Sequence, residues 1–289
     1  MTVPAVGRKP PVPGGPPPAP VVQHLLVTYA KRGRMRFASH RDVGRAFERA
    51  VRRAGLPMAH SAGFSPHPKI SYASGTPTGV SSEAEYLTLA LTAAQDPARL
   101  SRVLDTALPD GIDVIDVRED SGGTLNGRLM ASEWLVELPG ITPQAAEAAA
   151  RVFLAADDVH VERLTNKGVR RLDARGAVLD LALARRDAPP GECAILRMVV
   201  RHTEPTVRPE DILTALRQTA GLEPAAPAAV TRMAQGVIGE DGRVAGPAGP
   251  IAPAEVARPV RPGEPGGSGG PGKSDGHGEP DQPQHKDVP

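Results

Sequence analysis

The stretch that decides the fold runs from Lys31 to Gly75 and reads KRGRMRFASHRDVGRAFERAVRRAGLPMAHSAGFSPHPKISYASG. It divides into a basic turn, a helix, a proline-containing loop and a strand. Between Lys31 and Arg53 there are nine Lys or Arg residues and two acids, Asp42 and Glu48. The local charge is therefore +7, in a chain whose formal net charge is +1.

Residues 40–54 have the pattern of an amphipathic helix. Apolar side chains recur at helical spacing, at Val43, Ala46, Phe47, Ala50, Val51 and Ala54. The opposite face carries Arg41, Arg45, Arg49 and Arg52. Ser39 followed by Asp42 predicts an N-terminal capping box, and Gly55 is placed to end the helix in a left-handed conformation. One side of this helix should pack on a core while the other side is cationic.

The cationic face has two interpretations. Most charged helix faces are simply solvated. Solvated faces usually mix signs, however, because like charges four residues apart repel each other. Arg41, Arg45 and Arg49 repeat at that spacing, and Glu48 is the one acid within reach. We therefore favour an anion-binding face, with nucleic acid as the expected anion, over ordinary surface.

The first half of the chain predicts the order β-α-β-β-α-β. Strands are expected at 23–29, 70–72, 83–91 and 112–118, with helices at 40–54 and from Asp96-Pro97 to Pro109. This order is typical of a ferredoxin-like domain. Glu83 and Glu85 fall in the alternating third strand and are expected to face solvent.

A similar order follows after a linker at 119–130. Strands are expected at 132–138, 159–164, 177–184, 193–201 and 228–233, with helices at 143–154 and from Pro209 to Gly221. The expected fold class is α+β, with two tandem ferredoxin-like domains at 21–120 and 131–238. Residues 1–20 contain eight prolines, and residues 239–289 are rich in Gly, Pro and charge. Both ends are expected to be disordered tails, because they have little apolar surface to bury.

Composition excludes several classes of protein. A single cysteine, Cys193, rules out a disulfide framework and a multi-cysteine metal site within this chain. We find no signal-peptide pattern and no apolar run long enough to span a membrane, so a cytoplasmic location is expected. No nucleotide-binding glycine loop, zinc-protease motif or nucleophile elbow is present. We therefore expect no metal and no cofactor.

The loop GFSPHPKI at 63–70 is a second candidate site. Pro66 and Pro68 stiffen it and hold His67 and Lys69 on an extended segment. Phe64 is either a buried plug or an exposed ring that stacks on a base. Tyr72, in the following strand, is expected to stack on RNA or to pack against it.

Two further candidates are weaker. His40 lies between Arg36 and Arg41 and should lose its proton easily, which suits a general base in a metal-independent ribonuclease. The alternative for His40 is an ordinary surface or partly buried histidine. Residues 166–175 form a second basic stretch, with Lys167, Arg170, Arg171 and Arg175. Its plain alternative is an ion pair between Asp173 and Arg175 within a hairpin.

Three segments resemble a known family. They are RFASHRDVGRAFERAVRRAGLPMAHSAGFSPHPKISYA at 36–73, PTGVSSEAEYLTLAL at 77–91 and, more faintly, RRLDAR at 170–175. They are similar to the bacterial radical-SAM-linked domain of unknown function, across roughly residues 22–235. Its members occur free-standing or fused behind a B12-binding radical SAM domain. Where that family has RFLSHLD, this chain has Ala38 and Arg41.

The resemblance implies a radical SAM protein as partner. This chain lacks the three-cysteine cluster motif of that chemistry, so another polypeptide would supply the iron–sulfur cluster. The expected function is a non-catalytic accessory protein that binds structured RNA, either tRNA or rRNA. The alternatives are a protein–protein adapter that docks on the radical SAM partner, and a metal-independent ribonuclease. The residues expected to contact RNA are Arg34, Arg36, Arg41, Arg45, Arg49, Arg52, Arg53, Phe64, His67, Lys69, Tyr72, Lys167, Arg171 and Arg175.

Overall fold

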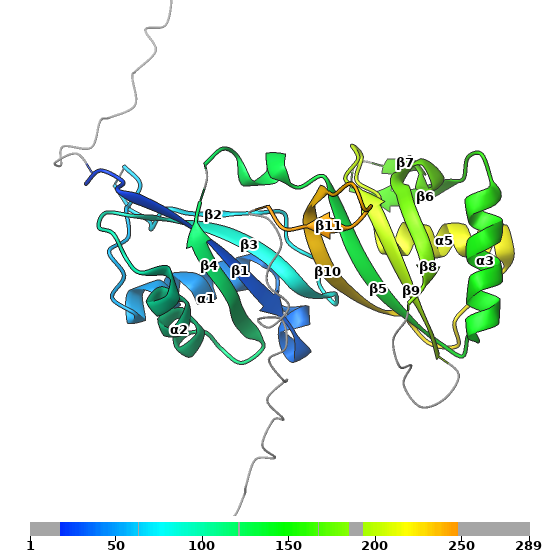
Figure 1. The fold of residues 1–289 in the computed structure, drawn as a ribbon, viewed down its shortest axis with the longest axis horizontal. Helices are drawn as coiled ribbons and strands as arrows, with labels where there is room; N and C mark the ends of the chain where they lie inside the picture. Colours follow the sequence, from blue (N-terminus) through cyan, green and yellow to red (C-terminus); the bar gives the residue numbers. More distant parts are fainter. Residues whose placement is uncertain (1–17, 63, 121, 167, 185–192, 248–289) are drawn as a thin grey trace, which may run out of the picture. The chain divides into compact units, whose positions relative to one another are not determined.

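The computed structural model describes residues 18–62, 64–120, 122–166, 168–184 and 193–247. Within these residues the chain has an α+β fold (Figure 1), with five α-helices and one large mixed sheet of nine strands. A separate two-stranded sheet completes it. Most of the two predicted tails, and Lys167, lie outside the described residues.

The first half contains four strands and two helices in the predicted β-α-β-β-α-β order. The elements are β1 (Gln23–Lys31), α1 (His40–Arg53), β2 (Ile70–Tyr72), β3 (Ser81–Leu91), α2 (Pro97–Ala107) and β4 (Ile112–Glu119). A short 3-10 helix, η1 (Gly33–Phe37), precedes α1. The strands lie in the order β4-β1-β3-β2, and all three pairings are antiparallel.

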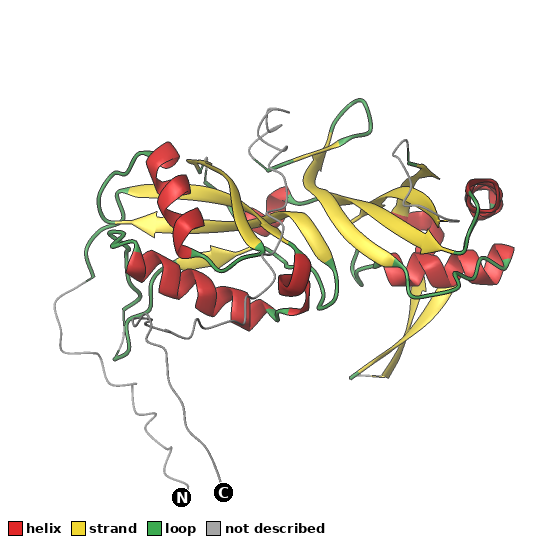
Figure 2. Cartoon of the chain, turned by 90° about the horizontal axis from the view of Figure 1, so that it is seen from below, coloured by secondary structure: helices red, strands yellow, loops and turns green. Residues whose placement is uncertain are grey.

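Both helices of this half cover the same face of its sheet (Figure 2). Alternate residues of β1 and β3, such as Leu25, Val27, Leu87 and Leu89, point into this layer. Phe47 of α1 is fully buried against them. The apolar stripe of α1 is thus the reason the helix lies on the sheet, because its burial removes large apolar side chains from water.

The opposite face of this sheet is partly covered by the segment predicted to be a linker. Residues Leu125–Arg128 form a short 3-10 helix, η2. Leu125 and Leu129 are buried there against Leu26 and Tyr86. The part of this segment from Leu125 to Leu129 is therefore packed structure rather than a free linker, because its two leucines contact apolar side chains on the sheet.

The second half contains its own helices and strands. They are β5 (Ala131–Pro139), α3 (Pro143–Ala155), β6 (His160–Thr165), β7 (Gly168–Asp173), α4 (Ala174–Ala177), β8 (Val178–Leu183), β9 (Cys193–Arg201), α5 (Pro209–Ala220), β10 (Ala229–Ile238) and β11 (Val244–Ala245). The main strands lie in the order β10-β5-β9-β8. β6 and β7 form the separate hairpin, and Val161 and Leu172 anchor it in the core beneath α3 and α5.

The two halves share one sheet. β3 and β10 pair in parallel over two residue pairs, Ser81 with Thr231 and Ser82 with Arg232. β10 ends at Ile238, the predicted domain boundary, and the chain then turns back into β11, where Val244 is buried. The ordered fold therefore includes residues that the sequence assigned to the C-terminal tail.

Candidate nucleic-acid interface

Both ends of helix α1 have the capping structure that the sequence predicts. The Ser39 side chain accepts a hydrogen bond from the backbone N–H of Asp42 at 3.2 Å, and the Asp42 carboxylate accepts one from the backbone N–H of Ser39 at 3.2 Å. This reciprocal capping box is confirmed. Gly55 follows the helix with φ of 63°, in the left-handed region that glycine tolerates. Both ends of α1 are thus fixed by local chemistry.

The outer side of α1 carries a cationic surface, which we call the arginine face. It consists of Arg41, Arg45, Arg49 and Arg52, and all four are exposed. Val43, Ala46, Phe47, Ala50 and Val51 are buried on the other side, so the predicted division of the helix is confirmed. In the part of the chain that the structure describes, none of the four arginines forms an ion pair with an acid.

The segment before α1 adds to this surface. Arg34 and Arg36 are exposed in η1. The Arg36 guanidinium lies 4.7 Å from the centre of the Phe37 ring, and Phe37 is 58% exposed. Phe37 was not among the residues predicted from the sequence, but it is an exposed aromatic ring of the kind on which bases stack.

The C-terminal end of α1 is less free. The Arg53 guanidinium donates a hydrogen bond to the carbonyl of Ala107 at 3.1 Å. Since Ala107 is the last residue of α2, Arg53 ties the two helices together. Arg53 is therefore less available to a ligand than Arg52.

Phe64 lies at the tip of an arm that projects from the edge of the sheet. The arm is formed by residues 58–61 and 67–69, which pair through hydrogen bonds such as Lys69 N–H to the carbonyl of Ala59 at 2.7 Å. Phe64 is 76% exposed, so the interpretation of a buried plug is wrong. Because this large apolar ring is exposed to solvent, it is available to a ligand.

The Tyr72 ring packs against neighbouring side chains and is not available to a ligand. Its ring makes edge-to-face contacts with His40 and Phe47, at centroid distances of 5.4 and 6.5 Å. Its hydroxyl donates to the carbonyl of Gly44 at 3.4 Å. Burial raises the pKa of Tyr72 well above its ordinary value. The ring supports α1 from below, so it is not placed as a stacking platform for RNA.

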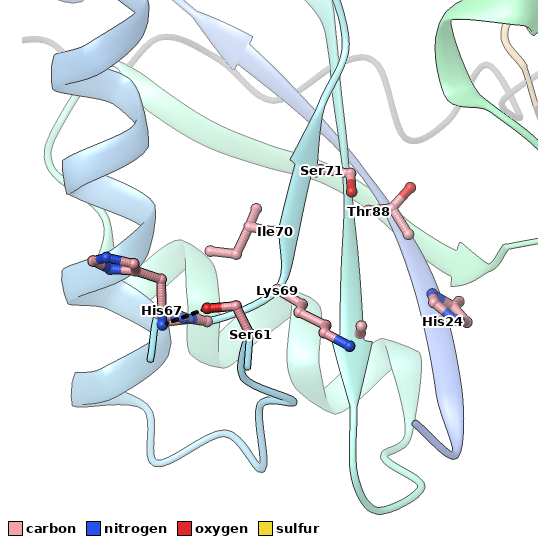
Figure 3. A pocket seen from close by; sticks show the side chains of 9 residues that line it. His24, Ser61, His67, Lys69, Ile70, Ser71 and Thr88 are labelled. Atoms are coloured by element: carbon pink, nitrogen blue, oxygen red, sulfur yellow. Dashed lines mark hydrogen bonds between the residues drawn. The ribbon is translucent and has the colours of Figure 1, made fainter. Parts of the chain in front are cut away.

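Lys69 lies apart from the arginine face. Ser71, two residues after Lys69, pairs with Thr88, whereas Leu87 and Leu89 at the alternate positions of β3 pack beneath α1. Figure 3 shows the Lys69 side chain in a hollow with Ser71, Thr88 and His24. The His67 ring extends away from His24 in the same view. Lys69 therefore belongs to the face of the sheet that the helices leave open.

The residues of the second basic stretch have different environments in the structure. Arg171 is exposed on β7, and Lys167 lies outside the described residues. Arg175 donates hydrogen bonds to the carbonyls of Leu154 at 3.3 Å and Val178 at 3.4 Å. The Asp173 carboxylate caps α4 by accepting from the N–H of Gly176 at 2.8 Å. The alternative of an Asp173–Arg175 ion pair is therefore wrong, and Arg175 has a structural role.

A buried cluster of charges lies under the N-terminal end of α1, and the sequence analysis missed it. Glu85 and Arg232 form an ion pair at 2.6 Å, with side chains only 4% and 5% exposed. Arg232 also donates to the carbonyl of Ser74. Lys31 donates to the carbonyl of Thr76 at 3.3 Å. The cluster thereby fixes the loop that follows β2.

The expectation that Glu83 and Glu85 face solvent is wrong. Glu83 pairs with Arg32 and is half-buried, and Glu85 is buried in the cluster. Burial of Glu85 opposes its ionisation, but Arg232, Ser82 and Lys31 outweigh this and hold the pKa of Glu85 below its ordinary value. Burial lowers the pKa of Lys31. No local pattern could reveal the pair, because Arg232 lies 147 positions from Glu85.

Two histidines, His40 and His202, have neighbours that bear on a role as a base. His40 is exposed in the first turn of α1, with its ring against Tyr72. His202 Nδ1 bonds the carbonyl of Leu129 at 2.8 Å, and its Nε2 lies 2.7 Å from the Ser132 hydroxyl. This pair has the spacing of a nucleophile and its base. Ser132 is buried, however, so a substrate cannot reach its hydroxyl and the pair is structural.

Among the described residues, no group of three or more His, Cys, Asp or Glu side chains is placed to hold a metal ion. No helix in the described ranges is long and apolar enough to cross a membrane.

A comparison with protein-family models gives a match to this chain. A family model with the description "Uncharacterized protein conserved in bacteria (DUF2344)" matches residues 24–209. The match begins in β1 and ends at the first residue of α5, so it includes the arginine face and the arm. A search of curated proteins finds no match to this chain.

Proposed function

Because the chain belongs to the DUF2344 family of uncharacterized bacterial proteins, we infer its function from the residues on its surface. We propose that it is a non-catalytic accessory protein that binds structured RNA through the arginine face. The RNA is of the tRNA or rRNA class. The arginines contact phosphates, and exposed aromatic rings next to α1 and at the tip of the arm stack on unpaired bases.

The observation that carries this proposal is the arginine face itself. Four guanidinium groups stand exposed on one side of a 14-residue helix, without ion pairs to acids among the described residues. A helix of that length extends about 21 Å, which is enough to follow several phosphates. Repulsion between like charges at this spacing weakens the helix slightly, and a polyanion removes that cost.

The partner in this proposal is a radical SAM protein. The support is the resemblance of segments 36–73 and 77–91 to the radical-SAM-linked domain. We also propose that each half is a ferredoxin-like unit. The support is that the strand orders β4-β1-β3-β2 and β10-β5-β9-β8 are equivalent once the β6–β7 hairpin is set aside as an insertion.

The test is the salt dependence of RNA affinity. Each phosphate contact releases counterions, so log K falls with log[salt] by roughly 0.7–0.9 per contact. Arg45, Arg49 and Arg52 changed together to Gln should reduce that slope by about two to three, measured with bulk tRNA at several salt concentrations. The melting temperature should change little, because exposed charges contribute little to stability.

The matched control removes three exposed arginines elsewhere. Arg151 on α3, Arg201 at the end of β9 and Arg217 on α5 are exposed and carry the same total charge. Their change to Gln should leave the slope as in the wild type. Equal slopes for the wild type and the α1 variant, with both folded, would remove the arginine face from RNA binding.

The adapter is the second candidate, and one observation favours it. Leu164 and Val169 are cross-strand partners in the β6–β7 hairpin, and they are 80% and 63% exposed. Exposed apolar pairs of this kind occur at protein interfaces. If the α1 variant keeps its salt slope while Leu164→Ser lowers recovery of the radical SAM protein in a pull-down, the adapter replaces RNA binding.

The ribonuclease is the third possibility and has the least structural support. His40 is in contact with Tyr72, and the Tyr72 hydroxyl is already bonded to a carbonyl. We expect no RNA cleavage by the wild type in EDTA. Cleavage that His40→Ala abolishes would show that the protein is an enzyme.

A further inference from the structure

A hollow of about 290 Å³ lies on the face of the first sheet that α1 and α2 do not cover (Figure 3). Its floor is formed by Ala90 and Thr88 of β3, which are both buried. Its sides are Lys69 and Ser71 on the β2 side and His24 on β1. Three neighbouring strands thus build the hollow.

The register of the strands explains why space is left there. His24 pairs with Ala90, and the carbonyl of Lys69 accepts a hydrogen bond from Ala90 N–H at 3.1 Å on the other side. Ala90 is therefore a short side chain in a row between two long ones. In the next row Ser71 pairs with Thr88, and both are also short. The floor is lower than its two sides because of side-chain length.

Beside the apolar Pro68, Ile70 and Ala90, the lining of the hollow contains several hydrogen-bond donors. Lys69 provides an ammonium group, His24 a ring N–H, and Ser61 and Ser71 provide hydroxyls. The His67 backbone N–H donates to the Ser61 oxygen at 3.1 Å, which leaves the Ser61 proton available to donate. No Asp or Glu is among the lining residues that the structure describes.

The carboxylate of Asp120, which contacts Thr88, is already compensated. Asp120 accepts a hydrogen bond from the Thr88 hydroxyl at 3.3 Å and an ion pair from Arg128 at 2.7 Å. Its side chain is 5% exposed. The Lys69 ammonium therefore determines the charge that the hollow presents to a ligand. A metal cation is disfavoured there, and an oxyanion is favoured.

We propose that this hollow binds a phosphomonoester, with Lys69 on the phosphate and with the Ser61 and Ser71 hydroxyls and His24 completing its hydrogen bonds. The volume is close to roughly 300 Å³, the lower end for small-molecule sites, so a phosphate and the group attached to it fit but a large cofactor does not. The phosphate belongs either to a free mononucleotide or to the 5′ end of an RNA. The inference is independent of the arginine face, because the site lies on the other face of the sheet.

Calorimetric titration of the full chain tests the proposal with 5′-AMP, adenosine and inorganic phosphate at constant ionic strength. We expect AMP and phosphate to bind and adenosine to fail. Lys69→Gln should weaken AMP binding by about tenfold or more, since it removes a charged hydrogen bond. Lys69→Arg should retain part of the affinity. Arg99→Gln, at an exposed position on α2, is the control for charge and should change nothing.

A second variant leaves every charge in place. Ala90→Leu fills the floor of the hollow and should abolish AMP binding, with a thermal melt to show that the sheet is intact. Lys69 is exposed, so Lys69→Gln remains a valid test even if Ala90→Leu does not fold. Equal binding of AMP and adenosine, or AMP binding unchanged by Lys69→Gln, overturns the proposal.

Oligonucleotides distinguish the two sources of phosphate. If the site reads an RNA end, a 5′-phosphorylated oligonucleotide binds about tenfold tighter than its 5′-hydroxyl counterpart, and Lys69→Gln removes the difference. If the ligand is free, AMP binds and the oligonucleotide phosphate makes no difference. The Arg45, Arg49 and Arg52 variant should keep AMP binding, so failure here and failure of the arginine face are separate results.

Discussion

Replacing Arg232 by Met should cost about 3–5 kcal/mol of unfolding free energy, because it leaves Glu85 as a buried, unpaired charge. The two side chains meet at 2.6 Å and are 5% and 4% exposed. Arg232 also donates to the carbonyl of Ser74 at 3.4 Å and to the hydroxyl of Ser82 at 3.4 Å. The substitution therefore removes the partners of several buried groups at once.

The assay is urea denaturation of the wild type, Arg232→Met, Glu85→Met and the double variant. The double variant removes both charges and should be clearly more stable than the sum of the single changes predicts. Arg243→Met is the matched control, because Arg243 pairs with Asp241 at 3.8 Å on the exposed surface, where a pair contributes about 0–1 kcal/mol. The reasoning fails if Arg232→Met costs no more than this control, or if the single changes are simply additive.

The same pair determines part of the acid sensitivity. The pKa of Glu85 is below its ordinary value in the folded protein, so its stabilisation is present above the unfolded pKa of about 4.3. It is lost as the pH falls through the lower folded pKa. Compared with the wild type, the double variant should therefore lose less stability between about pH 4 and pH 2. Parallel losses would show that Glu85 is not the group responsible.

Three further results are expected. Phe64→Ala should leave the melting temperature unchanged, since the ring is exposed, but weaken RNA binding by about 1–3 kcal/mol in a filter-binding assay; equal affinity would exclude stacking. Ser39→Ala should cost about 0.5–2 kcal/mol in urea, because the capping box with Asp42 is lost, and a smaller cost would show that packing alone fixes the helix start. Gly111→Ala should be much more destabilising than Gly33→Ala on thermal melting. Both have positive φ, but only at Gly111 does a Cβ come within 2.8 Å of a backbone oxygen.

Local patterns were sufficient to predict α1. Its apolar period, its capping box and Gly55 act within one or two turns of the chain, so they are visible in the sequence. The same period predicted the exposure of the arginine face. The β-α-β-β-α-β order of the first half followed from strand alternation and turn residues in the same way.

The burial of Phe64 and Tyr72 could not be predicted from local sequence patterns. Both are aromatic residues close to the proline-containing loop, and the sequence treated them alike. One is held in water at the tip of an arm, while the other packs under α1 because β2 points it at Phe47. Whether a ring is buried depends on which element covers it.

The sequence alone determined the helix, its charge and the order of elements in the first half, because these depend on neighbours along the chain. Only the tertiary structure decided which residues distant in sequence are in contact. It joined β3 to β10 and buried Glu85 against Arg232. It also placed Lys69, Ala90 and His24 in one row across three strands. Strand register determines which of these side chains are in contact, and register depends on the pairing of segments that are distant in sequence.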